Sequence, residues 1–247
     1  MTFPTRVLTS FYLIVLLALL GSKGVHGQAL SGSYTVDTTG GGDFQSINAA
    51  AQALNNNGVS GPVTINIKPG KYNEHIEIDS ITGVSGQNNI TFQSSTQNKA
   101  DVEIYQQGHR DTLVVFELSK TDHIQFQHLN VQVRTSSGGS SDLRYPFSIS
   151  GGVSHVVIQN CRIKAELGNS IYIKMLNFFD VKTIRHITIK NNIIQEGLIE
   201  VATLTTQNYN ITNLTFTDNK IYEDNGMAFQ HASDVVIKDN QFFATDD

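Results

Sequence analysis

The sequence predicts an all-β fold: a right-handed parallel β-helix with three short strands per coil and an N-terminal capping α-helix. The main observation is a ten-residue template, with apolar residues alternating on either side of one special position, that occurs at 123–132, 155–164, 186–195, 213–222 and 234–243. Another short alternating segment precedes each copy. The special positions are 32, 31, 27 and 21 residues apart, which leaves no room for a helix of useful length. Such units bury their apolar faces only by stacking, and parallel crossovers are almost always right-handed.

Composition supports a β fold and excludes some partners. The chain has 247 residues, is rich in Asn, Thr, Ser, Ile and Val, and lacks Trp. Its net charge of −5 gives no basic footprint for nucleic acid, and its single cysteine excludes an internal disulfide framework. An antiparallel sandwich is the alternative fold, but it needs hairpin dipeptides, and Asn-Gly occurs only at 57–58 and 225–226.

Residues 1–27 have the features of a signal peptide. Arg6 gives a positive start, 11–20 is an apolar run too short to cross a bilayer comfortably, and small residues end the segment. Removing it takes away Arg6 and Lys23 and no carboxylate, which changes the net charge to −7. We therefore predict a secreted or cell-surface protein with one domain at 28–247 and no membrane contact after cleavage. Because no capping segment follows the last strand, we expect further coils or a partner at the C-terminal end.

The start of the domain reads as a capping helix followed by the first coil. The pattern predicts a helix over 40–58, with Asp43 as N-cap, Gly58 as the stop, and apolar residues at helical spacing. In 61–78 we expect a strand, a Pro-Gly turn and a second short strand, with Val63, Ile65, Ile67, Ile76 and Ile78 facing inward.

The special position of the template predicts an internal ladder. It is occupied by Leu129, Cys161, Asn192, Asn219 and Asn240. Equivalent residues of stacked coils lie above one another, so the three asparagines should bond each other and the backbone of the turn between the second and third strands. Cys161 and Leu129 should fill the same position with apolar packing, which makes Cys161 a core residue and not a nucleophile.

These segments resemble a known group of proteins. The stretches 40–58 and 61–78 resemble the N-terminal region of pectinesterases, and units such as ITIKNN (187–192) resemble the repeats of the pectin-lyase-like right-handed parallel β-helix superfamily. The resemblance implies the fold and not an activity, because this fold hosts lyases, hydrolases, esterases and non-catalytic adhesins. Of the paired-Asp motifs of pectinesterases, HRDTL (109–113) matches only Asp111-Thr112-Leu113 and NFFDV (177–181) matches none.

The outer face of the first strand of each coil is the predicted site. Inward residues on these strands leave Ser148, Tyr172, Glu200 and Ala228 in one outward column and Ser150, Lys174, Ala202 and Gln230 in the next. Long excursions at 133–145 and 176–185 flank this face, which is typical of binding sites. We predict Lys174, Glu200 and Arg144 as catalytic residues, and Tyr172, Gln230 and His231 as substrate-binding residues. The outer face of the second strands reads as a solvated surface without a specific chemical role. The histidines show no metal-ligand spacing, so no metal site is predicted.

Two functions stay open at this point. A cation that neutralises a uronate carboxylate, together with a base, would make a lyase-like enzyme acting on acidic polysaccharide. Alternatively, the chain is a non-catalytic surface or adhesive module of a larger exported protein. Either reading names polysaccharide as the partner, and the sequence identifies no cofactor. Asn89, Asn210 and Asn213 each begin a glycosylation sequon.

Overall fold

The computed structural model describes residues 27–108, 112–135, 143–165, 171–174, 184–195, 199–202, 211–222, 227–229 and 232–244. The predicted fold is confirmed. Three parallel sheets, called A, B and C, wind around one core, and each strand pairs with its counterparts one coil before and one coil after. In the described residues the chain passes through sheets A, B and C in turn, from β2-β3-β4 to β17-β18-β19, as a right-handed parallel β-helix.

Each sheet is a row of parallel strands that follow one another along the axis of the solenoid. Sheet A contains, in spatial order, β1 (Leu30–Val36), β2 (Val59–Ile67), β5 (Ile90–Ser94), β8 (Asp122–Gln127), β11 (Ser154–Gln159), β14 (Ile184–Lys190), β17 (Ile211–Thr217) and β20 (Ala232–Lys238). Sheet B contains β3 (Gly70–Asn73), β6 (Val102–Gly108), β9 (Asn130–Thr135), β12 (Arg162–Ala165), β15 (Ile193–Gln195), β18 (Lys220–Tyr222) and β21 (Gln241–Phe243). Sheet C contains β4 (Ile76–Asp79), β7 (Thr112–Ser119), β10 (Leu143–Ser150), β13 (Ile171–Lys174), β16 (Ile199–Ala202) and β19 (Met227–Phe229).

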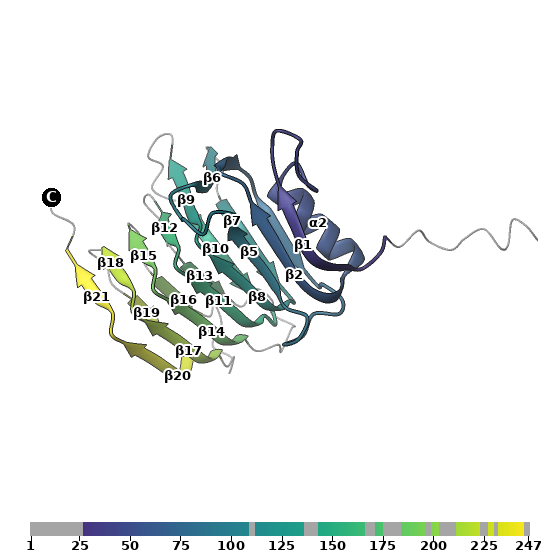
Figure 1. The fold of residues 1–247 in the computed structure, drawn as a ribbon. Coiled ribbons are helices and arrows are strands. Elements are labelled where there is room, and N and C mark those ends of the chain that lie inside the picture. The colour runs from purple at the N-terminus through teal and green to yellow at the C-terminus, as the bar shows by residue number, and fades with distance from the viewer. Residues whose placement is uncertain are drawn as a thin grey trace, which may run out of the picture.

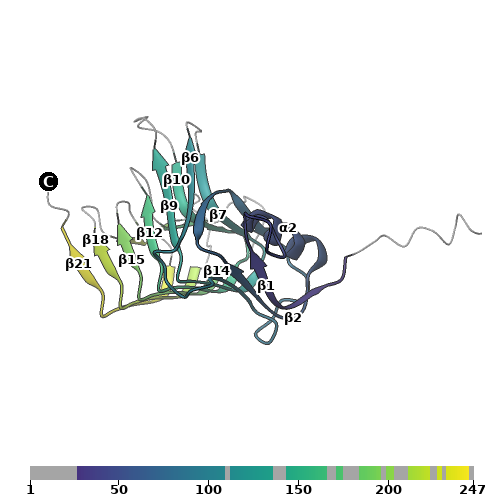
Figure 2. The same cartoon turned by 45° about the horizontal axis from the view of Figure 1, so that its top comes forward.

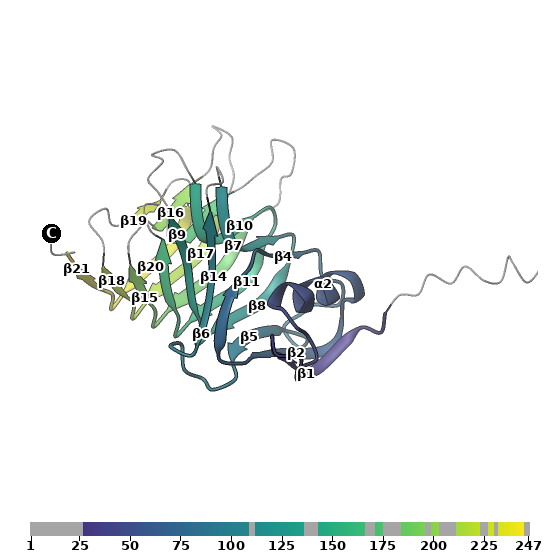
Figure 3. The same cartoon turned by 90° about the horizontal axis from the view of Figure 1, so that it is seen from above.

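The coils stack side by side along one axis. Figure 1 shows helix α2 (Ile47–Asn57) at one end and β20 and β21 at the other, where the C-terminus lies. Figure 2 shows the strands of sheet B, from β6 to β21, following one another in order. In the view from above, α2 lies at the same end as β1, β2 and β4 (Figure 3). Within the described residues, no helix is both long enough and apolar enough to cross a membrane.

The predicted helix exists, but its N-cap is Ser46 and not Asp43. The Ser46 hydroxyl accepts a hydrogen bond from Ala49 N at 3.0 Å, whereas the Asp43 carboxylate accepts one from Thr35 N at 2.7 Å and fixes the preceding turn. Phe44 forms a parallel bridge with Val36 and is not helical. Gly58 ends the helix as expected, with a φ of 68° that favours glycine.

Four buried phenylalanine rings pack together in the N-terminal half of the core. The rings of Phe92, Phe116, Phe126 and Phe147 are fully buried and lie on strands of sheets A and C, with neighbouring centroids 4.6–6.2 Å apart. Such contacts add about 0.5–1.5 kcal/mol per pair beyond the buried area. The five inward aliphatic residues predicted for 61–78 are also buried.

The C-terminal half contains the predicted asparagine ladder. The Nδ2 group of Asn192 donates to Asn219 Oδ1 at 3.1 Å, and that of Asn219 donates to Asn240 Oδ1 at 2.9 Å. Each amide also donates to a backbone carbonyl of the preceding coil. Cys161 is fully buried at the top of the ladder, and its N–H donates to Asn192 Oδ1 at 2.9 Å. Burial raises the pKa of the Cys161 thiol to about 12, so this side chain is a core group.

Candidate functional site

The strand register of sheet C aligns the residues of the predicted column, and the column is longer than expected. The register places Ser148 beside Tyr172, Tyr172 beside Glu200, and Glu200 beside Ala228. The same column continues toward α2 through Glu117 and then Glu77. Neighbouring parallel strands lie about 4.8 Å apart. Two glutamates on adjacent strands therefore belong to the same column as Glu200, although their strands are more than eighty residues away in sequence.

The predicted site residues can be placed only in part. Tyr172, Lys174 and Glu200 lie on β13 and β16, with Lys174 beside Ala202 in the register. The side chains of these three residues lie outside the described part of the chain, as do Gln230 and His231 altogether.

Arg144 lies in a different place from the one that the sequence predicts. The prediction puts it in a surface excursion over 133–145, but β9 extends to Thr135 and β10 begins at Leu143, so Arg144 belongs to a strand and pairs with Leu113. Its side chain is 1 % exposed. Two neighbours on the outward face of this strand, Ser148 and Ser150, are only 6 % and 5 % exposed. Sheet C is therefore covered at the level of β10.

A histidine contacts the acidic column at Glu117, between Glu77 and Ser148. His75 Nδ1 lies 2.8 Å from the carbonyl oxygen of Val114, and His75 Nε2 lies 3.5 Å from Glu117 Oε2. A carbonyl oxygen only accepts, so Nδ1 carries a proton. The Nε2 atom therefore faces the Glu117 carboxylate. The side chains of His75 and Glu117 are 41 % and 34 % exposed, which leaves them accessible to a ligand.

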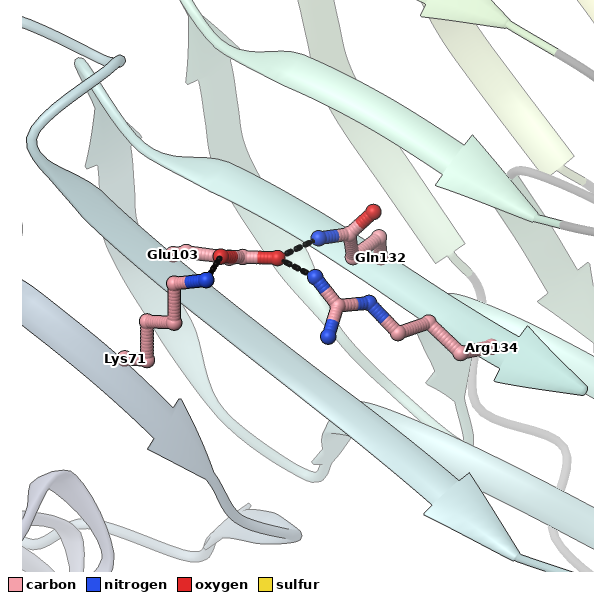
Figure 4. A network of polar contacts seen from close by, with 4 residues as sticks. All are labelled: Lys71, Glu103, Gln132 and Arg134. Atoms are coloured by element: carbon pink, nitrogen blue, oxygen red, sulfur yellow. Dashed lines mark hydrogen bonds and ion pairs between the residues drawn. The ribbon is translucent and has the colours of Figure 1, made fainter. Parts of the chain in front are cut away.

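Sheet B carries a polar network that the sequence did not indicate (Figure 4). Glu103 on β6 accepts hydrogen bonds from Gln132 and Arg134 on β9, and Lys71 Nζ on β3 lies 3.5 Å from Glu103 Oε2. The guanidinium of Arg134 also lies 4.4 Å from the centre of the Tyr105 ring. The carboxylate of Glu103 is 13 % exposed, whereas Lys71 and Arg134 are 72 % and 31 % exposed. The cations therefore face solvent while the carboxylate holds them in place.

The same face continues down the solenoid. Arg162 lies beside Asn130 in the register and Lys220 lies beside Ile193, and both side chains are exposed. The next column ends in Tyr222 and Phe243, whose rings stack with centroids 4.6 Å apart. Sheet B thus presents exposed cations, amides and aromatic rings on consecutive coils.

The charges separate by sheet. The strands of sheet B contain five cations, Lys71, Arg134, Arg162, Lys164 and Lys220, and one carboxylate, Glu103. The strands of sheet C contain four carboxylates, Glu77, Asp79, Glu117 and Glu200, and two cations, of which Arg144 is buried. In a chain with a net charge of −5, sheet B is therefore the face that attracts an anion.

No group of three or more histidine, cysteine, aspartate or glutamate side chains in the described ranges could hold a metal ion.

The binding face on sheet B was not predicted, because the prediction rested on the outward residues of the first and second strands of each coil, and sheet B is formed by the third strands. Alternation in the third strands, as in NVQVRT (130–135) and RIKA (162–165), is the signal that would have revealed it.

Comparison with known proteins gives a structural likeness only. A scan against protein-family models finds no match, and a search of curated proteins finds none. The fold is similar to that of the deglycosylated pectin methylesterase from Aspergillus niger, with 13 % identity and a TM-score of 0.51 over 90 % of this chain and 89 % of that chain. It is also similar to Escherichia coli ybhc, with 13 % identity and a TM-score of 0.47 over 87 % and 72 % of the two chains. The chain therefore has the pectin-lyase-like right-handed parallel β-helix fold.

Proposed function

We propose that this protein is secreted or displayed at the cell surface and binds an acidic polysaccharide along the outer face of sheet B. The observation that supports this most is the set of cations on four of the strands of sheet B, β3, β9, β12 and β18, with Arg134 held between Glu103 and Tyr105. A guanidinium that is already oriented loses less conformational entropy when it forms a two-point contact with a carboxylate. Uronate residues of pectin-like polymers present such carboxylates at regular intervals.

The stacking of the coils fits an extended ligand. Equivalent side chains recur about every 4.8 Å along the axis. A polymer lying along sheet B would therefore meet Lys71, Arg162 and Lys220 in one column, three and then two strands apart. Tyr105 and Tyr222 lie in the neighbouring column and offer flat apolar surfaces to sugar rings.

The test is a binding assay with polygalacturonate and with a neutral glucan as the control ligand. We expect polygalacturonate to bind with an affinity that falls with added salt. The double substitution Arg162→Glu and Lys220→Glu should weaken binding at least tenfold, because it reverses two exposed charges. The matched control is Lys190→Glu with Lys238→Glu on sheet A, which makes the same change in net charge. Equal losses in the two variants would refute the assignment to sheet B.

The second candidate is lyase-like turnover on sheet C, with Lys174 and Glu200 as catalytic residues and Tyr172, Gln230 and His231 binding the substrate; Arg144 is left out because it is buried. The register of Tyr172 beside Glu200, with Lys174 two residues along the same strand, favours it. Formation of unsaturated uronate is followed by its absorbance. Lys174→Ala and Glu200→Ala should each abolish turnover without lowering the melting temperature. Binding without turnover on any polysaccharide would instead support a non-catalytic surface module.

A further inference from the structure

Three histidines that are far apart in sequence form one stack on sheet A. The rings of His123 and His155 are 4.3 Å apart at 7°, and those of His155 and His186 are 4.6 Å apart at 21°. Each histidine is the second or third residue of its strand and has a left-handed backbone, with φ between 53° and 56°. Asn213 and Asp234 have the same conformation at the same place in the next two coils. The stack therefore results from one conformation repeated in register.

The stack borders a groove. A cavity of about 280 Å³ on the outer face of sheet A is lined by the three imidazoles and by Gly86, Asn89, Gln125, Val157 and Thr188. Its wall thus combines imidazole, amide and hydroxyl groups with apolar surface, to which Val157 contributes. In addition, His123 Nδ1 and Asp122 Oδ1 are both buried, are 3.8 Å apart, and have no hydrogen-bond partner in the described part of the chain. Buried polar atoms of this kind normally find a partner.

The charged groups around the stack are few. Strand β8 contributes Asp122, β14 contributes Arg185, and the loop at 80–89 on the other side of the groove contains no charged residue. Burial lowers the pKa of His155, and the positive charges of His123, His186 and Arg185 lower it further, while Asp122 opposes them. Two parallel rings less than 5 Å apart cannot both be charged without a cost, and an anion in the groove would offset that cost.

We infer that the His123–His155–His186 groove is a binding site for a single carboxylate group, such as that of a uronate sugar, which is taken up together with a proton. Protonated imidazoles supply the donors, and Asn89, Gln125 and Thr188 can hydrogen-bond the hydroxyl groups of the sugar. The carboxylate specificity is suggested by the proposed function, but the site lies on a different sheet and is tested without the polymer.

The experiment is a titration of galacturonate monosaccharide into the full chain at about pH 5.5 and about pH 8, on either side of the ordinary pKa of histidine. Calorimetry gives the affinity, and NMR of the histidine ring protons locates the site. We expect binding at least tenfold tighter at the lower pH, with proton uptake and shifts of the His155 and His186 signals. Galactose, which lacks the carboxylate, should not bind.

His155→Asn is the diagnostic variant, because asparagine already occupies this position in a later coil and tolerates the left-handed backbone. It should abolish galacturonate binding at low pH. The matched control is His128→Asn at the other corner of the coil, where Asn160 and Asn191 are the equivalents. Equal affinity at both pH values, or normal binding by His155→Asn, would overturn the inference. Either result leaves the sheet B proposal intact, since that one is measured with polygalacturonate and charge reversals on sheet B.

Discussion

The two ends of the solenoid differ in how the core and the strand edges are covered. A β-helix exposes unpaired strand edges and an open layer of core side chains at both ends. At the N-terminal end, α2 covers the core with Ile47, Ala50, Ala51 and Leu54, all of them fully buried. At the other end of the described chain, Val236, Ile237, Phe242 and Phe243 on β20 and β21 are 38–57 % exposed. They are the large hydrophobic residues with the highest exposure in the described part of the chain.

The N-terminal end is closed by polar contacts as well as by apolar packing. The side-chain amide of Asn55 donates to the carbonyl of Glu77 at 2.9 Å and accepts from Asp79 N at 3.2 Å, so it satisfies the free edge of β4 as a neighbouring strand would. Glu74 in turn accepts hydrogen bonds from the N–H groups of Ile47 and Asn48 at the start of α2. Helix and first coil therefore cap each other.

Near the C-terminal end, the same asparagine hydrogen bonds recur from one coil to the next. The N–H of Asn192 donates to Asn219 Oδ1, and that of Asn219 donates to Asn240 Oδ1, both at 3.0 Å. The comparison teaches that a solenoid end is closed either by a different element that mimics a strand or by another layer of the same kind.

The largest expected effect is loss of the middle of the ladder. Asn219 is fully buried and takes part in four side-chain hydrogen bonds, so Asn219→Ala leaves several buried backbone and amide groups without partners. We expect the free energy of unfolding to fall by about 3–5 kcal/mol. Denaturant titration measures it, with Asn73→Ala, at an exposed position of β3, as the control. A loss below about 1 kcal/mol would show that the ladder is not what holds the C-terminal coils.

A smaller loss is expected at the opposite end. Asn55→Ala removes the two hydrogen bonds to the edge of β4, and it should lower the free energy of unfolding by about 1–2 kcal/mol. The control is Gln52→Ala, on the exposed face of the same helix. If the two variants were equally stable, water would be an adequate substitute for Asn55 at this edge.

The cap should also respond to pH. Burial raises the pKa of Glu74, and its hydrogen bonds from Asn48 and Ile47 only partly oppose this. Folding therefore favours the protonated form, and this contribution is present below the unfolded pKa of about 4.3 and is lost as pH rises through the raised folded value. Thermal unfolding of wild type and Glu74→Gln at pH 4 and pH 7 isolates the group. On going from pH 7 to pH 4, the melting temperature of the wild type should rise relative to that of Glu74→Gln. A relative fall would contradict the raised pKa of Glu74.

The smallest effect on stability is expected at the exposed end. Ile237→Lys and Phe242→Lys remove apolar side chains that are 48 % and 57 % exposed, so each should change the free energy of unfolding by no more than about 0.5 kcal/mol. Self-association should change much more. We expect the wild-type chain to associate at high concentration in light scattering and the double variant to remain monomeric. A monodisperse wild type would mean that this end does not cause association.

Periodic features could be predicted from the sequence alone. The three strands per coil, the inward residues of each strand and the positions of Asn192, Asn219 and Asn240 follow from local alternation, and alternation determines which side of a strand faces the core. The terminal capping helix followed from its apolar spacing. Its N-cap did not, because Asp43 and Ser46 are both good caps and only the packing of Phe44 against the first strand decides between them.

Contacts between coils were decided by the tertiary structure. Residues about thirty positions apart become neighbours only once every loop has been accommodated, and the coils differ in length, so the Glu103–Arg134 network is not visible as a motif. His123, His155 and His186 share the first position of the ten-residue template, so their common register is present in the sequence, whereas the stacking of their rings is not. The histidines showed no metal-ligand spacing in the sequence, and the repeated left-handed backbone stacks three of them. The sequence suggested a surface loop for Arg144, whereas the extension of β10 buries it. Local chemistry thus determined the coil, and the register between coils determined which side chains meet on its surface.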